Sequence, residues 1–144
     1  SISSKQGPTP QEEYSLTHLI MKKKKLLLCL GSNFDQEENI AKARKLLCNI
    51  FGDIVFSQNL WTTPIGKGTS LYLNCLAITE TTMDRDELNT LLKKTERSLG
   101  RTQTEKEKNI VRIDIDILRY DKQKLHPEDW ERYYVKQLLQ QLKS

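Results

Sequence analysis

Residues 113–117 read IDIDI, and this stretch decides what kind of sheet the chain can build. Side chains in a β-strand alternate between the two faces, so Ile113, Ile115 and Ile117 share one face. Asp114 and Asp116 then project together from the other face. We expect the isoleucines to be buried in the core and the aspartates to lie on an accessible face, as in an antiparallel sheet that is covered on one side.

Paired aspartates in a strand also make a candidate metal site. The carboxylates of Asp114 and Asp116 are expected about 7 Å apart, where they repel each other unless a cation lies between them or water screens them. Aspartate is depleted in strands, so strand propensity does not explain the pair, whereas a hard divalent ion such as Mg²⁺ does. The wet face of an antiparallel sheet is the structural alternative. We expect Arg112 to lie beside the two carboxylates.

The rest of the chain supplies the partners of this strand. Apolar periods and turn residues predict strands over 24–30, 53–63, 72–81 and 110–120, and helices over 35–51, 84–99 and 127–142. The charged segment RTQTEKEKN, residues 101–109, is expected to be a mobile loop. The resulting order, β-α-β-β-α-β-α, contains two β-α-β halves. It predicts a ferredoxin-like α+β sandwich, in which an antiparallel sheet has helices packed on one face.

Composition and length limit the class of protein. The 144 residues suit one domain. Residues 1–21 include two prolines and show no sustained period, so we expect a tail that is disordered or not native, followed by a single domain over 22–144. With 23 basic and 19 acidic residues, the charge favours anionic small ligands over nucleic acid. The apolar run over 26–30 is too short for a signal peptide or a membrane span, which predicts a cytoplasmic protein without a membrane partner.

Two further pairs of polar residues are candidates for chemistry, and each has a structural alternative. Glu96 and Arg101 flank the end of the predicted helix over 84–99, where an arginine also interacts favourably with the helix dipole. His126 and Arg132 lie at the start of the last predicted helix, where a histidine is often a cap or a surface residue.

Taken in order, these segments resemble one family, the 6-hydroxymethyl-7,8-dihydropterin pyrophosphokinases of folate synthesis. The matching segments, from Lys24 to about Leu139, are LGSN with NIAKA, LWTTPIG, LYLN, TERSLGR and RIDIDILRY. The resemblance implies the ferredoxin-like fold and transfer of pyrophosphate from ATP, the co-substrate, to the hydroxymethyl oxygen of a dihydropterin. It also implies two Mg²⁺ ions. We expect a monomer whose partners are ATP and the hydroxymethyl dihydropterin.

The resemblance assigns roles to individual residues. The implied metal ligands are Asp114 and Asp116. The residues implied in catalysis are these two with Arg101 and Arg112. The implied pterin pocket consists of Thr63, Pro64, Ile65, Tyr72, Asn74 and Tyr134. The implied nucleotide site consists of Glu96, Arg101, Ile117, His126 and Arg132.

Two departures from the family pattern bear on activity. Three residues before Asp114, where the family usually has an arginine, this chain has Val111, and Arg112 is shifted by one position. The segment over 101–109 lacks the tryptophan and the second arginine that are common there, and Arg112, Lys106 or Lys108 could supply the missing charge.

Other functions therefore stay open at this point. The main alternative is a catalytically weak or inactive relative that acts as a pterin-binding module or as a partner of another folate enzyme. A ferredoxin-like RNA-binding domain is a remote third possibility, because the chain lacks the K/R-G-F/Y-G/A-F pattern of such domains.

Overall fold

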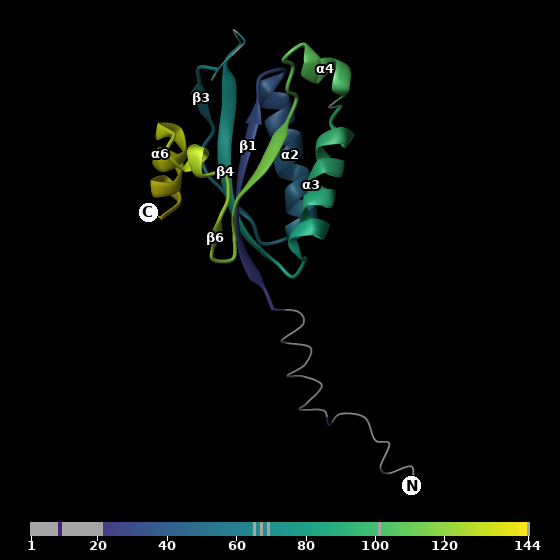
Figure 1. Cartoon of the computed structure of the whole chain (residues 1–144), viewed down its shortest axis with the longest axis vertical. Helices are drawn as coiled ribbons and strands as arrows, with labels where there is room; N and C mark the ends of the chain where they lie inside the picture. The colour runs from purple at the N-terminus through teal and green to yellow at the C-terminus, as the bar shows by residue number, and fades with distance from the viewer. Residues whose placement is uncertain are drawn as a thin grey trace.

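The computed structural model describes residue 9 and residues 22–64, 66, 68, 70–100 and 102–143, apart from the side chain of Lys106 (Figure 1). The predicted tail over 1–21 lies outside the described residues except for Thr9. The strands are β1 (Lys24–Ser32), β2 (Val55–Phe56), β3 (Leu60–Thr62), β4 (Tyr72–Thr81), β5 (Asp114–Tyr120) and β6 (Gln123–Lys124). The helices are α2 (Gln36–Phe51), α3 (Arg85–Ser98), α4 (Gln103–Glu107), α5 (Pro127–Trp130) and α6 (Tyr133–Lys143).

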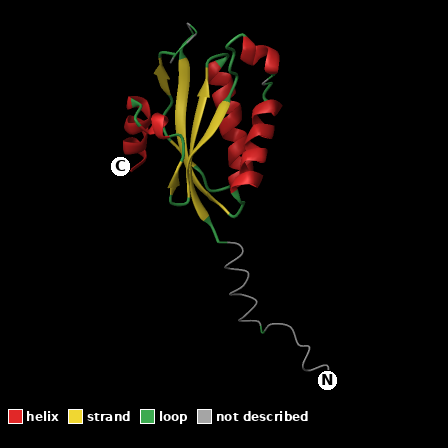
Figure 2. Cartoon of the chain, viewed as in Figure 1, coloured by secondary structure: helices red, strands yellow, loops and turns green. Residues whose placement is uncertain are grey.

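Within the described residues, the six strands form one sheet. Its order is β2-β4-β1-β5-β6, and β3 also pairs with β4. Every pairing is antiparallel. Figure 2 shows this sheet between helices of the same chain. The arrangement confirms the predicted α+β class and fits the ferredoxin-like sandwich.

Helices α2 and α3 cover one face of the sheet, as predicted (Figure 1). Ile113, Ile115 and Ile117 are all buried beneath them, so the alternation in IDIDI separates the two faces of β5 as expected. The other face is covered only in part. Helix α6 packs on it and contributes Val135 and Leu138 to a smaller apolar cluster. The uncovered remainder of this face is where the aspartates of β5 lie.

The strand expected over 53–63 is interrupted, and Ser57 explains the interruption. Its backbone N–H donates to the carbonyl of Leu76 at 2.9 Å, but its hydroxyl oxygen accepts from the N–H of Leu76 at 2.8 Å. A side chain thus replaces a backbone carbonyl in the ladder, and β2 and β3 are separate strands. The expectation of one continuous strand was wrong.

Two more expected elements differ in the structure. The segment over 101–109 was expected to be a loop, but it contains α4, where Thr102 Oγ1 accepts from the N–H of Glu105 at 3.2 Å and caps the helix. The helix expected over 127–142 is divided into α5 and α6. The indole N–H of Trp130 donates to the carbonyls of Leu118 and Leu125 at 3.0 and 2.9 Å, which ties α5 to β5 and to the segment after β6. None of the described helices is long and apolar enough to cross a membrane.

Candidate active site

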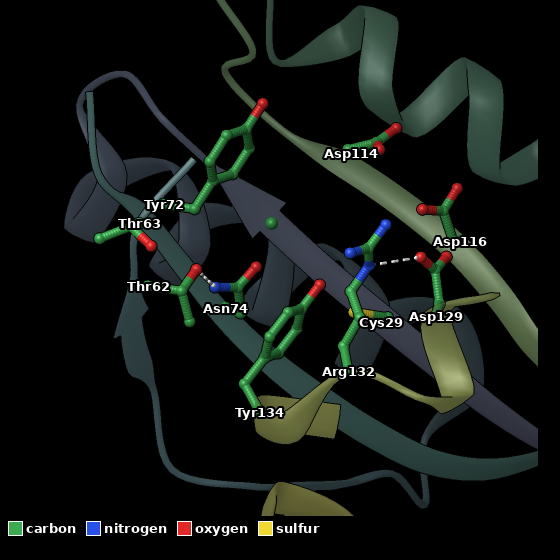
Figure 3. A pocket seen from close by; sticks show the side chains of 11 residues that line it. Cys29, Thr62, Thr63, Tyr72, Asn74, Asp114, Asp116, Asp129, Arg132 and Tyr134 are labelled. Atoms are coloured by element: carbon green, nitrogen blue, oxygen red, sulfur yellow. Dashed lines mark hydrogen bonds and ion pairs between the residues drawn. The ribbon is translucent and has the colours of Figure 1, made fainter. Parts of the chain in front are cut away.

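A cavity of about 200 Å³ opens on the uncovered face of the sheet (Figure 3). We call it the inner cavity. Its lining comes from β1, β3, β4, β5 and the α5–α6 segment: Cys29, Gly31, Thr62, Thr63, Tyr72, Asn74, Asp114, Asp116, Asp129, Arg132 and Tyr134. It is smaller than the roughly 300–1,000 Å³ of sites for drug-sized molecules, so it suits a compact ligand.

A wider cavity of about 810 Å³ lies at the β5 edge of the sheet, and we call it the outer cavity. It is lined by Asp84, Arg85, Asp86, Asn89, Lys93, Ile115, Asp116, Ile117, Leu125 and His126. Asp116 lines both cavities. A carboxylate at this junction can act on ligands that arrive from either side.

The floor of the inner cavity is formed by the side-chain amide of Asn74, which is held in place, and by the backbone of Gly31. Asn74 is buried, and its Nδ2 donates to Thr62 Oγ1 at 2.7 Å. Gly31 pairs with Asn74 across the β1–β4 ladder. A Cβ on Gly31 would lie only 3.2 Å from Asn74 Oδ1. The glycine therefore leaves this amide oxygen uncovered, and a flat ligand can approach it closely.

Two tyrosines reach the inner cavity from different elements. Figure 3 shows the ring of Tyr72, from β4, and the ring of Tyr134, from α6, both turned toward it. Tyr133 packs edge-to-face on Tyr134 with 6.0 Å between the ring centroids. Burial raises the pKa of Tyr134, so its phenol stays protonated and can donate a hydrogen bond. Two aromatic rings and a fixed amide are well suited to a planar heterocycle with a polar edge.

Negative charge accumulates on the β5 side of the cavity. Burial, and then the neighbouring Asp114, raise the pKa of Asp116 to about 7, while the charge of His126 opposes this shift. The negative charge of Asp129 also raises the pKa of Asp116. Mutual repulsion of this kind would be relieved by a bound cation. Asp114 and Asp116 offer only carboxylate oxygens, the donors that Mg²⁺ prefers, so the residues present fit this ion.

His126 and Arg132 lie on different cavities. His126 lines the outer cavity, is exposed, and has a left-handed backbone with φ 52°. Arg132 lines the inner cavity, and its Nε donates to Asp129 Oδ1 at 3.1 Å (Figure 3). Among the described residues, His126, Glu128 and Asp129 have ligand atoms within 4.8 Å of one another, so this group could also hold a metal ion.

Of the other predicted residues, several line the cavities and several do not. Ile117 lines the outer cavity. Glu96 lines neither; it is buried and accepts a hydrogen bond from the N–H of Ile115 at 2.7 Å, which satisfies the free edge of β5. Pro64 is not among the lining residues of either cavity. Ile65 and Arg101 lie outside the described residues.

Arg112 forms an ion pair with Glu105 of α4. Its Nε donates to both carboxylate oxygens of Glu105, at 2.9 and 3.0 Å, and it lines neither the inner nor the outer cavity. That Arg112 lies beside Asp114 and Asp116 stays a prediction, and the contact that the structure shows for its Nε is with Glu105.

The sequence prediction missed four residues of the inner cavity. Cys29 and Gly31 share a face of β1, and the alternation that placed the aspartates could have placed them too. Thr62 directly precedes the predicted Thr63. Asp129 had no comparable signal, because its position depends on how α5 is tied to the sheet.

A family model described as 7,8-dihydro-6-hydroxymethylpterin-pyrophosphokinase (HPPK) matches residues 27–144. Comparison with individual curated proteins gives no match. The matched span includes every residue that lines the inner and outer cavities.

Proposed function

Because the chain belongs to the 7,8-dihydro-6-hydroxymethylpterin-pyrophosphokinase family of folate biosynthesis, we propose that it transfers pyrophosphate from ATP to 6-hydroxymethyl-7,8-dihydropterin with the help of Mg²⁺. One observation carries the proposal: Asp116 lies at the junction of two cavities with different chemistry. A transferase needs its two substrates to meet at one point, and a carboxylate at that point suits a phosphoryl group that is accompanied by a cation.

The inner cavity is the proposed pterin site. The uncovered amide oxygen of Asn74 can accept a hydrogen bond from the lactam edge of the pterin, and Tyr72 and Tyr134 can stack on its rings. Thr63 lines the cavity, and Pro64 and Ile65, which follow it in sequence, complete the proposed pocket. The small volume of the cavity is in favour of one bicyclic ring system.

The outer cavity is the proposed nucleotide site. Its basic residues, Arg85, Lys93 and His126, can meet phosphate charge, and the side chain of Ile117 offers an apolar contact. Arg132 would contact the phosphates from the side of the inner cavity. Arg101 is a further proposed phosphate ligand. Glu96 would act on the site through its hydrogen bond to β5.

Asp114 and Asp116 would hold the proposed pair of Mg²⁺ ions, which would neutralise the phosphate charge when bound. In the proposed reaction, the hydroxymethyl oxygen of the pterin bonds to the β-phosphorus of ATP. The bond from that phosphorus to the oxygen that bridges it to the α-phosphorus breaks, AMP leaves with this oxygen, and the hydroxyl proton is released to water. The tasks left to the protein are to align the hydroxyl with the phosphorus and to exclude water, which needs no protein nucleophile.

The direct test is to incubate the protein with ATP, Mg²⁺ and 6-hydroxymethyl-7,8-dihydropterin. We expect AMP and the pterin pyrophosphate in equal amounts, and neither product when the pterin is omitted. Absence of AMP above background, with an active member of the family assayed alongside, would contradict the proposed reaction.

A second candidate function is a pterin-binding module without turnover. It is favoured by Val111, which stands in place of the usual arginine, and by the engagement of Arg112 with Glu105. Calorimetry separates the two functions. The module predicts pterin binding without Mg-ATP binding, whereas the enzyme predicts both.

A further inference from the structure

Arg112 connects three parts of the chain that meet at the end of the sheet where β5 begins. Its Nε donates to both carboxylate oxygens of Glu105 on α4. Its guanidinium also lies over the ring of Phe34, with 4.8 Å from Cζ to the ring centroid. The two charged side chains are only 30% and 21% exposed, so solvent screens this pair less than a surface pair.

The start of the segment between α3 and β5 also packs on Arg112. Gly100 has φ +103°, a conformation that residues with a side chain rarely adopt. A Cβ at Gly100 would lie 2.9 Å from Cδ of Arg112. Only glycine lets the stem of Arg112 pass this close to the chain, so Arg112 contacts the segment at its start and, through Glu105, in its middle.

The end of the same segment is fixed by the turn after β1. The backbone N–H of Asn33 donates to the carbonyl of Val111 at 2.9 Å, and the Asn33 side chain accepts from the N–H of Val111 at 2.6 Å. Nδ2 of Asn33 donates to the carbonyl of Asn109 at 2.7 Å. Phe34, the next residue, is the one that Arg112 stacks on. Residues 33 and 34 thus form a platform on which the segment over 109–112 rests.

We propose that Arg112, Glu105 and Phe34 form a clasp, in which Arg112 ties α4 to the platform. Arg112 is then a positioning residue for the nucleotide rather than a phosphate ligand. The role in nucleotide binding rests on the proposed function, because the clasped segment begins next to Arg101, a proposed phosphate ligand. Arg112 then does not replace the arginine that Val111 displaces.

The physical benefit of the clasp is pre-organisation. Fixing one backbone residue costs about 1–2 kcal/mol, and a charged segment with few buried side chains has little else to offset this cost. If the clasp already orders the segment, ATP binding does not have to do so. Loss of the clasp should therefore weaken nucleotide binding while leaving the pterin pocket intact.

Hydrogen exchange tests the clasp without any substrate. We compare Glu105→Gln and Arg112→Lys with a matched control, Glu107→Gln, which removes the same charge from an exposed position of the same helix. Amide exchange over residues 102–111 should be about three- to tenfold faster in the first two variants, as expected for a charge-assisted pair that is partly exposed. The control should stay within about twofold of the wild type. Equal exchange in all four proteins would overturn the clasp.

Steady-state kinetics test its role in nucleotide binding. Glu105→Gln should raise KM for ATP by about three- to tenfold and change KM for the pterin by less than about twofold, and the Glu105→Gln/Arg112→Lys double variant should be no worse than the single variants. An unchanged or lowered KM for ATP in Glu105→Gln would contradict a positioning role. If the wild type makes no AMP, the proposed function fails, and the exchange data still decide whether the clasp exists.

Discussion

The inner and outer cavities share Asp116 but are built in different ways. The inner cavity is formed on neighbouring strands, whose pairing sets the distance between Gly31, Asn74 and Asp114, and its amide is held by Thr62. The outer cavity lies at the start of α3 and beside the exposed His126. The proposed pterin site is thus part of the sheet itself, whereas the proposed nucleotide site depends on elements around it.

Charge shows the same contrast. The outer cavity mixes Arg85, Lys93 and His126 with acidic side chains, so a triphosphate bound there would need added positive charge from a metal ion. The inner cavity depends on shape and hydrogen bonds. We therefore expect substitutions in the inner cavity to affect one substrate and substitutions at Asp116 to affect the reaction as a whole.

The largest effect should come from Asp116→Asn, because this residue belongs to both cavities. The amide keeps the shape of the carboxylate but removes the charge of a proposed metal ligand. We expect the rate of AMP release to fall by about a thousandfold or more, as for loss of metal-ion stabilisation of phosphoryl transfer. The rate should be measured at saturating Mg²⁺, and a rate within tenfold of the wild type would show that Asp116 is not a metal ligand.

The next largest effect separates the two cavities. Asn74→Ala removes the buried amide, so a polar pterin edge would lack its partner, at a cost of about 2–3 kcal/mol. KM for the pterin should rise about 30- to 150-fold, with KM for ATP nearly unchanged. Thr62→Val, which keeps the amide but removes the oxygen that orients it, should have a smaller effect in the same direction. Equal losses for both substrates in Asn74→Ala would mean that the cavities are not separate sites.

A third prediction concerns the stability of the metal-free protein. The pKa of Asp116 is raised from its ordinary 3.8 to about 7 in the folded state, so its proton binds more tightly in the folded than in the unfolded chain. The stability that this proton provides is complete below about pH 4 and is lost as the pH rises through about 7. Asp116→Asn lacks this loss, and its free energy of unfolding at pH 8 in EDTA should exceed that of the wild type by about 1–3 kcal/mol.

Urea denaturation of both proteins at pH 4 and at pH 8 checks this prediction. The difference in free energy of unfolding between the variant and the wild type should increase with rising pH and should decrease when Mg²⁺ is added at pH 8. A difference that does not depend on pH would exclude titration of Asp116 as its cause.

The smallest effect is expected at Asp129, which lines the inner cavity. Asp129→Asn weakens the ion pair that orients Arg132, in which the side chains of Arg132 and Asp129 are 30% and 23% exposed. We expect a loss of about three- to tenfold in kcat/KM for ATP. Glu131→Gln, an exposed residue of the same segment with the same charge change, is the matched control and should lose less than about twofold. Equal losses in the two variants would show that net charge, and not the orientation of Arg132, matters.

Much of the fold could be predicted because it follows from local periods. The alternation in IDIDI placed the isoleucines in the core and the aspartates on the open face. The break at Ser57 could not be predicted, since it depends on a hydroxyl that replaces a carbonyl opposite Leu76, a contact between distant parts of the chain. The short helix α4 did have a signal, because Thr102 and Glu105 have the spacing of a capping box.

The candidate site was less accessible to prediction from residue patterns. The aspartate pair follows from the strand period, whereas Asn74 and Tyr134 came only from the family resemblance. The pairing of Arg112 with Glu105 could not be predicted from a local pattern, because it joins the residues before β5 to α4. The segment LGSN has two roles that no local pattern indicates. Gly31 leaves the amide oxygen of Asn74 accessible in the inner cavity, and Asn33 forms hydrogen bonds with the segment over 109–112.

The central claim is that two separate cavities meet at Asp116, and calorimetry tests it most directly. The pterin and a non-hydrolysable ATP analogue with Mg²⁺ are titrated separately into the wild type, Asn74→Ala and Asp116→Asn. We predict that the wild type binds both ligands, that Asn74→Ala loses only the pterin, and that Asp116→Asn loses only the Mg-nucleotide. Retention of wild-type Mg-nucleotide affinity in Asp116→Asn, or loss of both ligands in Asn74→Ala, would contradict the account.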